Sequence, residues 1–303
     1  MAKVTIRQLE VFLEVARHPT LSAAASALHL SESAVSHVVT ELERALGERL
    51  TVRRKAKGVT LTAAGELVAR RARTVVEAIH EIPHELAQGR DGRLAGPVAV
   101  GCYNGIADSV LPPVVQRFAE DFPEVRVDIR VGDNDELIEA LHEGSLDLAV
   151  LYDVNLPTGL TKRMIYPTEV VAVLPADHPL AAGPDVDLAD LVAEPLIVLD
   201  TRPSRENTLE AFEARGLSPN LRAAIPQIEV VRALVGRGLG YTLLRSRPAV
   251  MHRTTEGRPL TGLPLRPRFG RSAVVAAWPS ALRPNARTLT VAEVCREEFA
   301  AFR

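Results

Sequence analysis

Apolar residues near the N-terminus recur at helical spacing and predict successive short helices. The sequence TIRQ, which starts at Thr5, has the spacing of a capping box, so a first helix is expected to begin there and to end before Pro19. Ser22 is expected to cap a second helix, with Leu28 and Leu30 as its core anchors. The alanines of this second helix would let a neighbouring backbone approach closely.

The third predicted helix has two different sides, and Ser31 is in position to cap it. Its apolar stripe consists of Val35, Val39, Leu42 and Leu46. Its polar stripe consists of Ser33, Ser36, His37 and Thr40. A solvated helix face usually carries longer charged side chains, whereas short hydroxyls suit a surface that presses against phosphates and base edges. The pattern favours a helix that packs on one side and contacts DNA on the other, although a solvated face stays the alternative.

Two short β-prone runs follow the third helix and predict a wing. They cover residues 50–52 and 59–61, on either side of a basic turn that ends in Gly58. The cations of this turn include Arg53, Arg54 and Lys57. They are expected to lie along the DNA backbone, where they would add affinity without sequence discrimination.

A longer helical pattern begins at Thr62. Its apolar residues alternate at spacings of four and three, a heptad seam formed by Val68, Ala72, Val75, Ile79, Ile82 and Leu86. Such a seam predicts pairing with a second helix, and packing against the chain's own body is the alternative. Pro83 predicts a kink or an early end. The sequence GRDGR at 89–93 predicts a flexible hinge.

Beyond the hinge, short apolar strands alternate with helices, which predicts an α/β body with a mainly parallel sheet. One set of elements covers 97–152 and a second covers 169–244, so two lobes are expected. The chain is then expected to return to the first lobe through a strand at 273–278 and a last helix near 292–302.

Ligands of open parallel sheets bind beyond the carboxyl ends of the strands. The predicted strand ends place seven polar side chains there: Tyr103, Asn104, Asp153, Thr201, Ser204, Arg205 and Gln227. Ser204 as a helix cap with Arg205 beside it would suit a carboxylate or a phosphate. A plain cap and a surface ion pair would explain the same two residues equally well.

Length and composition limit the class of protein. The 303 residues are about two domains' worth at ~150 residues each, and 47% hydrophobic with 24% charged residues describes a globular soluble chain. No apolar run approaches the ~18 residues of a membrane helix, and the N-terminus lacks a signal-peptide pattern. A cytoplasmic location without membrane contact is therefore expected.

Charge is divided unevenly along the chain. Residues 1–73 carry 12 basic and 7 acidic side chains, which leaves 24 against 31 for the rest. A basic head fits phosphate contact, although a solvated basic face would give the same count. The two cysteines, Cys102 and Cys295, are too few for a disulfide scaffold or a structural zinc site and are expected to be buried thiols.

The head resembles the winged helix-turn-helix of LysR-type transcriptional regulators. The residues that carry the resemblance are Phe12, 21–25, HLSESAVS at 29–36, ELERALGERL at 41–50 and LTAAG at 61–65. The body is similar to the effector domain of the same family, itself like periplasmic binding proteins, through LPADHPL at 174–180 and GRGLGYTLL at 236–244. The resemblance covers essentially the whole chain.

The resemblance implies a winged helix-turn-helix at 1–61, a linker and dimerisation helix at 62–88, a hinge at 89–95 and an effector domain at 96–303. Lobe I would take 96–165 and 269–303, and lobe II 166–268. The implied partners are double-stranded DNA, a small-molecule effector and a second copy of the chain. Tetramer formation and contact with RNA polymerase stay open. No metal or cofactor is implied.

The family's DNA-contacting positions fall on residues of the third helix and the wing: Ser31, Glu32, Ser33, Ser36, His37, Thr40, Arg53, Arg54 and Lys57. Two residues depart from the family pattern. Glu32 stands where the family usually has Gln, and Thr51 where it usually has a large aromatic residue. Base preference therefore cannot be transferred from relatives.

Enzymes and solute-binding proteins are the competing classes. The α/β body could host an enzyme, but the sequence has no glycine-rich phosphate loop, Ser-elbow pattern or metal-spaced pair, so no catalytic residue is expected. The attached head argues against a free-standing solute-binding protein. His178 fits a surface turn, Trp278 fits the core, and Cys102 keeps only a minor possibility of acting as a redox switch.

Overall fold

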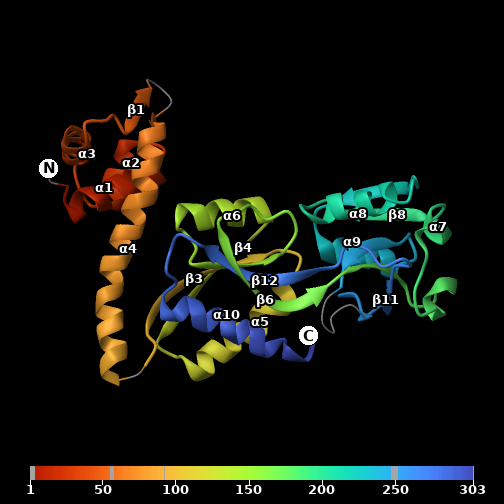
Figure 1. The fold of residues 1–303 in the computed structure, drawn as a ribbon. Coiled ribbons are helices and arrows are strands. Elements are labelled where there is room, and N and C mark those ends of the chain that lie inside the picture. Colours follow the sequence, from red (N-terminus) through yellow and green to blue (C-terminus); the bar gives the residue numbers. More distant parts are fainter. Residues whose placement is uncertain (1–3, 55–57, 92, 247–251, 303) are drawn as a thin grey trace. The chain divides into compact units, whose positions relative to one another are not determined.

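The computed structural model describes residues 4–54, 58–91, 93–246 and 252–302 (Figure 1). The chain divides into two units, and the change between them falls at Gly96 and Pro97. The first unit holds α1 (Ile6–Arg17), α2 (Leu21–Ala27), α3 (Glu32–Leu46), β1 (Thr51–Arg54), β2 (Gly58–Leu61) and α4 (Ala63–Asp91).

Hydroxyl caps fix where the first three helices begin. The capping box at Thr5 is confirmed, because its Oγ1 accepts from the Gln8 backbone N–H at 3.3 Å and its own N–H donates to Gln8 Oε1 at 2.9 Å. Ser31 is likewise confirmed as the cap of α3. The prediction of Ser22 for α2 is wrong. Thr20 caps that helix, because its backbone is still extended and its hydroxyl reaches the Ala23 N–H, which leaves Ser22 within the first turn.

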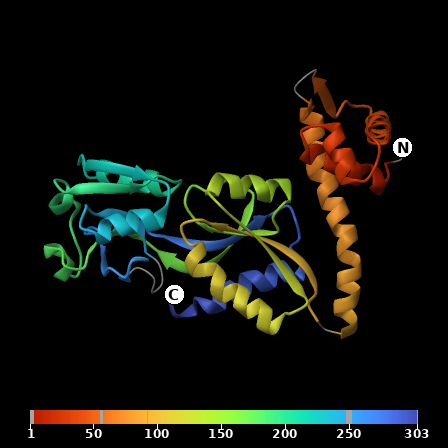
Figure 2. The ribbon, with the colours of Figure 1, turned by 180° about the vertical axis from the view of Figure 1, so that it is seen from behind.

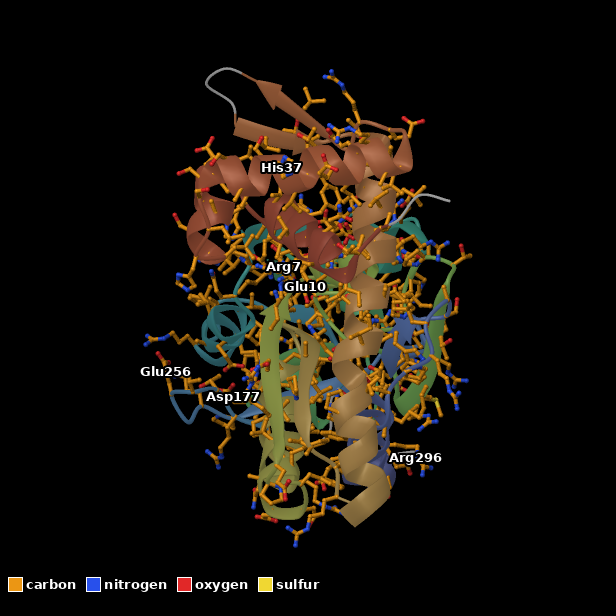
Figure 3. All side chains as sticks on the ribbon, turned by 90° about the vertical axis from the view of Figure 1, so that its left-hand side faces the viewer. Arg7, Glu10, His37, Asp177, Glu256 and Arg296 are labelled. Atoms are coloured by element: carbon orange, nitrogen blue, oxygen red, sulfur yellow. The ribbon has the colours of Figure 1, made fainter. Side chains whose placement is uncertain are left out.

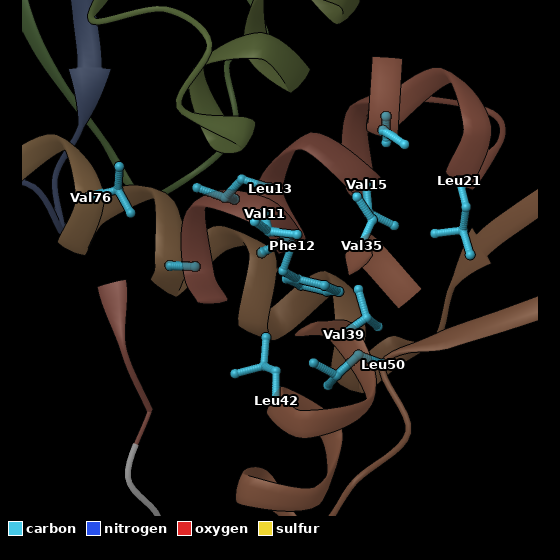
Figure 4. Packing of buried hydrophobic residues seen from close by; sticks show 14 residues of the cluster. Val11, Phe12, Leu13, Val15, Leu21, Val35, Val39, Leu42, Leu50 and Val76 are labelled. Atoms are coloured by element: carbon cyan, nitrogen blue, oxygen red, sulfur yellow. The ribbon is translucent and has the colours of Figure 1, made fainter. Parts of the chain in front are cut away.

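The core of the first unit is built by α1, α2, α3 and the start of α4. Phe12 of α1 is fully buried and lies among Val39, Leu42 and Leu50 (Figure 4). Two predicted core anchors are exposed instead, Leu30 and Leu46. Leu30 follows a left-handed residue at the turn between α2 and α3, and Leu46 is the last residue of α3, so neither faces the cluster.

One carboxylate ties the wing to α3. Glu43 Oε1 accepts the backbone N–H of Leu50 at 2.8 Å, the backbone N–H of Thr51 at 3.0 Å and the Thr51 hydroxyl at 3.2 Å. Strands β1 and β2 then pair antiparallel, with Thr51 opposite Leu61. Gly65 of α4 lies directly against this junction, since a Cβ there would stand 2.1 Å from the Leu50 carbonyl oxygen. The chain therefore needs glycine at the end of its LTAAG sequence.

Helix α4 runs without interruption from Ala63 to Asp91, so the early end expected at Pro83 is wrong, and the alternative of a kink there stays a prediction. A proline removes one hydrogen bond and crowds one turn, and here the rest of the ladder carries the helix past it. The predicted hinge is wrong in part, because 89–91 belong to the helix. Gly92 lies outside the described residues, and 93–95 are irregular.

The predicted heptad seam divides between two environments. Val68 and Ala72 pack into the core of the chain's own first unit. Val75 and Ile82 are 45% and 51% exposed, and Leu67 on the same side is exposed too. The helix therefore uses one side to support the head and leaves Leu67, Val75 and Ile82 uncovered, whereas the side chain of Leu86 lies outside the described part.

The second unit contains two lobes, and lobe I is a five-stranded sheet covered by helices on both faces (Figures 1 and 2). Helix α6 covers one face, whereas α5 and α10 lie together on the other. The elements are β3 (Gly96–Tyr103), α5 (Ala107–Asp121), β4 (Val125–Gly132), α6 (Asn134–Glu143), β5 (Leu148–Tyr152), β6 (Leu160–Thr168), β12 (Ser272–Pro279), α10 (Ala286–Glu298) and the 3-10 turn η3 (Ala300–Phe302).

The return of the chain to lobe I is confirmed, because β12 enters the sheet between β5 and β6. It runs antiparallel to both neighbours. Strands β3, β5 and β6 therefore share one direction and β12 runs against them, so the expectation of a mainly parallel sheet is confirmed for these strands of lobe I. Strand β6 was not predicted, and its pairing with β12 continues to Thr168, past the boundary expected after residue 165. Alternation in this strand is weak because only its last part is buried.

Lobe II is built around one strand that is buried on both faces. In β7, Val170, Ala172 and Leu174 pack toward α8, whereas Val171 and Val173 pack toward α9. The lobe consists of β7 (Val170–Pro175), η1 (Pro179–Ala182), α7 (Leu188–Leu191), β8 (Pro195–Leu199), α8 (Ser204–Glu213), β9 (Asn220–Ile225), α9 (Ile228–Gly236), β10 (Thr242–Arg245) and β11 (Leu260–Pro264). Strands β10 and β11 flank β7 antiparallel, and β8 pairs parallel with β9.

Among the described residues, no helix combines the length and apolar character that a membrane crossing requires. Nor does any cluster of histidine, cysteine or acidic side chains in those ranges have the makings of a metal site.

Glu43 generates a test of the wing junction. Replacing it with alanine leaves the backbone N–H groups of Leu50 and Thr51 without their acceptor. We therefore expect Glu43→Ala to lower the free energy of unfolding by about 2 kcal/mol. Glu43→Gln keeps one acceptor oxygen and should cost about half of that. Urea unfolding of the full chain measures both changes. Glu48→Ala, a change at an exposed acid just after the end of α3, is the matched control, and equal losses for the two alanine variants would contradict the role of Glu43.

Candidate functional site

The polar side of α3 is open to solvent within its own unit. Ser31, Glu32, Ser33, His37 and Thr40 are exposed, and Ser36 is half-buried. The opposite side of the same helix is sealed, with Val35, Val39 and Leu42 in the core. Figure 3 labels His37 on α3. The helix therefore has the two-sided character that the sequence predicts, with a row of polar side chains on its solvent side.

Hydrogen bonds within α3 pre-order part of this surface. The Ser31 hydroxyl accepts from the Ala34 N–H at 3.2 Å and lies 3.0 Å from the Ser33 hydroxyl. The Thr40 hydroxyl donates to the Ser36 carbonyl at 2.9 Å. These bonds orient the hydroxyls of Ser31 and Thr40. The unpaired N–H groups of the first turn add a site that attracts phosphate.

The cations expected in the wing fall at the edge of the described structure. Arg53 and Arg54 belong to β1, but their side chains lie outside the described part. Lys57 lies outside the described residues altogether. Their contact with DNA stays a prediction.

A second cluster of polar groups joins the two lobes. Tyr103, at the end of β3, is fully buried. Its hydroxyl lies 2.9 Å from the Thr201 hydroxyl and 3.1 Å from the Ser204 hydroxyl. The structure thus brings together three of the seven predicted cleft residues, from chain segments about a hundred residues apart.

Three residues that sequence reasoning missed extend this cluster: Tyr152, Asn207 and Arg245. The Tyr152 ring lies 5.4 Å from the Tyr103 ring, centroid to centroid, and the Arg245 guanidinium lies 5.4 Å from the Tyr152 centroid. Arg245 Nη2 donates to Asn207 Oδ1 at 3.0 Å. A charged residue at the carboxyl end of the apolar strand 241–244 was the available signal, because that is where ligand-binding side chains gather.

Burial changes the electrostatics of Arg245. Desolvation lowers the pKa of its guanidinium, with opposing contributions from Tyr152, Glu210 and Tyr103. An arginine pKa starts so high that the group keeps its charge at neutral pH. The interior of the cluster therefore carries a positive charge.

The remaining predicted cleft residues have other surroundings. Arg205 pairs with Asp200 at 2.6 Å, so its guanidinium forms the surface ion pair that was the alternative interpretation. Asp153 pairs with Lys162 of β6 at 2.7 Å. Gln227 is exposed and Asn104 is half-buried, and no described contact joins either of them to the cluster.

The expectation that Ser204 caps a helix is wrong. The N-cap of α8 is Pro203, which has no side chain that can accept a hydrogen bond. Ser204 is the first residue within the helix, and its hydroxyl is turned to Tyr103 instead.

An exposed ion pair also spans the lobes. Arg202 donates to Asp135 of α6 at 3.0 Å and to Glu206 of α8 at 2.8 Å. These side chains are largely exposed, so solvent screens the pair and its contribution to stability is small. The buried Tyr103 hydroxyl is the more specific link between lobe I and lobe II.

Four other residues have the structural surroundings expected of them. His178 caps η1 through Nδ1, which accepts from the Leu180 N–H, and its Nε2 lies 2.8 Å from a Glu194 oxygen. Trp278 is buried in β12. Cys102 and Cys295 are both free and buried.

Comparisons with known proteins match both units. Residues 6–66 match the family model of the bacterial regulatory helix-turn-helix protein, lysR family, and residues 91–300 match the LysR substrate binding domain. The chain belongs to the LysR family. It is thus a DNA-binding transcriptional regulator with a substrate-binding domain for an effector.

Individual relatives agree with this family over most of their length. The chain is 31% identical to the nitrogen assimilation regulatory protein nac of Klebsiella aerogenes, over 80% of this chain and 78% of the relative. It is 29% identical to the HTH-type transcriptional regulator MetR of Escherichia coli strain K12, over 77% and 73%. The solved structure of HinK, a LysR family transcriptional regulator from Pseudomonas aeruginosa, is 31% identical with a TM-score of 0.63 and covers 98% of this chain and 99% of that one.

The structure explains one of the two departures from the family pattern. Thr51 stands where LysR regulators usually have a large aromatic residue, and its hydroxyl donates to Glu43. In this LysR regulator the junction between α3 and the wing is therefore held by hydrogen bonds to a carboxylate. The second departure, Glu32, is exposed at the start of α3.

The Tyr103 hydroxyl generates a test of the link between lobes. We expect Tyr103→Phe to keep the buried ring but to lose the bonds to Thr201 and Ser204, which should cost about 1 kcal/mol of stability. Amide hydrogen exchange in the first turn of α8 should rise. Exchange in α5 should stay unchanged and serves as the internal control, and an unaltered first turn of α8 would exclude the link.

The buried thiols generate a second test. Burial raises the pKa of Cys102 well above its ordinary value and that of Cys295 to about 12, so the reactive thiolate is scarce at pH 8. We expect a thiol reagent such as DTNB to label neither cysteine in the native chain and both in urea. Fast native labelling of Cys102 would instead support its use as a redox switch.

Proposed function

We propose that this LysR regulator reads its operator with the polar face of α3 and holds the duplex with the wing. The single observation that carries the proposal is the two-sidedness of α3, with a solvent-open row of short hydroxyls opposite a sealed apolar stripe. A helix of this kind fits the major groove, where Ser and Thr hydroxyls reach either base edges or phosphates. The residues proposed for contact are Ser31, Glu32, Ser33, Ser36, His37, Thr40, Arg53, Arg54 and Lys57.

The proposal includes dimer formation along α4. The exposed stripe of Leu67, Val75 and Ile82 is the apolar surface that a second copy would cover. Two heads held by such a pair would bind consecutive major grooves of a pseudo-palindromic site. Pairing of dimers into tetramers and contact with RNA polymerase extend the same proposal. Its site of action is the compartment that holds the DNA, the cytoplasm.

The body supplies the control in this proposal. A small molecule bound among Tyr103, Thr201 and Ser204 would compete for hydroxyls that now join the lobes. Occupancy would shift the population between two arrangements of the lobes, and with it the spacing or bend of the DNA. Neither catalysis nor a cofactor is part of the proposal.

Two pairs of substitutions test the DNA contacts. We expect Ser36→Ala with His37→Ala to relax sequence preference, because base contacts carry specificity. Arg53→Ala with Arg54→Ala should weaken binding to all duplexes and flatten the salt slope by about one unit for each lost phosphate contact. Gel-shift titrations on a cognate operator and on random duplex, at several salt concentrations, measure both effects.

The comparison of the two duplexes decides the assignment. Glu48→Ala, an exposed change outside the proposed surface, is the control and should leave both affinities unchanged. An equal loss on operator and random duplex after the change at Ser36 and His37 would exclude base reading by this face of α3.

A further inference from the structure

Arg245 is a buried cation whose counter-charge the described residues do not supply. The residue is 6% exposed at the end of β10. Its Nη1 donates to the Gly270 carbonyl at 2.7 Å, and its Nη2 donates to Asn207 Oδ1 at 3.0 Å. Both acceptors are neutral. Within the described ranges no carboxylate lies at ion-pair distance, and Glu210, which acts on the group through its charge, is an exposed residue.

Two hydrogen-bond donors at the same place lack an acceptor among the described residues. They are Arg245 Nε and Asn207 Nδ2, and both are buried. Asn207 is itself 6% exposed. An orphaned buried donor is costly, and a buried cation without a partner more so. Because both orphans are donors beside a positive charge, the partner that would satisfy them is a negatively charged acceptor.

A small cavity is lined by both of these residues. It measures about 10 Å³ and is lined by Ser204, Asn207, Thr208, Arg245 and neighbouring apolar residues of lobe II. That volume holds about one water-sized oxygen. Ser204, the first residue of α8, belongs to the same wall.

We propose that Arg245 and Asn207 form the binding site for a small organic carboxylate, with one carboxylate oxygen in the cavity and the rest of the molecule toward Ser204 and Tyr103. The proposal rests on the effector function proposed above and gives that effector its chemical class. A fork-shaped guanidinium matches the planar carboxylate, and the Tyr152 ring lies 5.4 Å from the guanidinium carbon, so its face favours the positive charge.

The position of Arg245 explains how such a ligand would act on the lobes. Arg245 pairs with Val170 in the sheet, directly after the chain enters lobe II, and bonds Gly270, directly before it returns to lobe I. To reach the cavity from the cleft, the ligand replaces the Tyr103 hydroxyl at Ser204. The anion therefore binds where both connections between the lobes meet and removes a bond between them.

Thermal unfolding of the full chain with added carboxylates tests this site. The probes are formate, acetate and propionate, against formamide, acetamide and propionamide as neutral molecules of the same shape, at constant ionic strength. We expect at least one carboxylate to raise Tm by about 3 °C at ten times its Kd, and the amides to have no effect. Inorganic phosphate is a further arm, and better protection by phosphate than by any carboxylate would overturn the choice of carboxylate.

Matched variants locate the effect. Arg245→Gln should raise the Kd of the best carboxylate at least about tenfold, because it removes a charge-assisted pair. Arg205→Gln removes an exposed arginine from the same helix region and should leave that Kd unchanged. Asn207→Asp places a carboxylate beside Arg245 within the protein, so it should raise Tm without ligand and abolish the response. The Asn207→Asp variant keeps the test decisive if Arg245→Gln fails to fold.

The results that would overturn the carboxylate site can be told apart from results that would overturn the proposed function. No response to any of the three carboxylates, equal protection by the amides, or a full response in Asn207→Asp would each overturn the carboxylate site. Duplex binding by the same preparations is measured in parallel. If the carboxylate site is refuted but DNA binding is intact, the proposed DNA-binding function stands and only the carboxylate as effector is rejected. If the chain binds no duplex at low salt, the proposed DNA-binding function is itself refuted.

Discussion

The insertion of β12 between β5 and β6 is the constraint on which the second unit depends. Lobe I cannot be completed until the chain has built lobe II and returned, so exactly two connections join the lobes along the described chain. Antiparallel pairing of β12 with both neighbours holds the return in register. The residues at the two crossings, among them Val170 and Gly270, are thereby brought to one place. A polar group at that place reaches both connections at once.

In the first unit, single helices carry two sides with different roles. In α3 the apolar stripe fixes the position of the helix and the hydroxyl stripe stays exposed on the opposite side. In α4 one side supports the head through Val68 and Ala72 while Val75 and Ile82 stay uncovered. Both helices therefore carry two surfaces with different partners, and their sequences meet both demands through a three-to-four residue period.

Local signals in the sequence predicted most of the elements, because caps and periodicity act within a few residues. The capping box at Thr5 and the cap at Ser31 are of this kind. The errors arose where a local rule competes with its surroundings. Thr20, not Ser22, is the N-cap of α2, and the hydrogen-bonded backbone of α4 continues beyond Pro83. Strand β6 escaped prediction because its pattern is blurred by partial exposure.

The candidate sites divide in the same way. The surface of α3 follows from one helix and was predictable from spacing. The cluster of the cleft follows from contacts between Tyr103, Thr201 and Arg245, whose separations in sequence no short pattern records. Strand ends indicated Tyr103, Thr201 and Ser204 correctly as neighbours, but the same rule also named Asp153 and Gln227, which the described contacts leave outside. Tertiary pairing, as between Arg205 and Asp200, decides which candidates remain available.

Glu43 has a consequence for the engineering of DNA specificity. Its single carboxylate oxygen binds three donors at the start of the wing, so the angle between α3 and the wing is encoded in the last turns of α3 itself. A chimera that receives the third helix of another regulator would lose this hydrogen-bonded junction unless the donor helix also carries an acid at the position of Glu43. A helix segment exchanged into this protein should therefore end before residue 43, or Glu43 and Thr51 should be exchanged together.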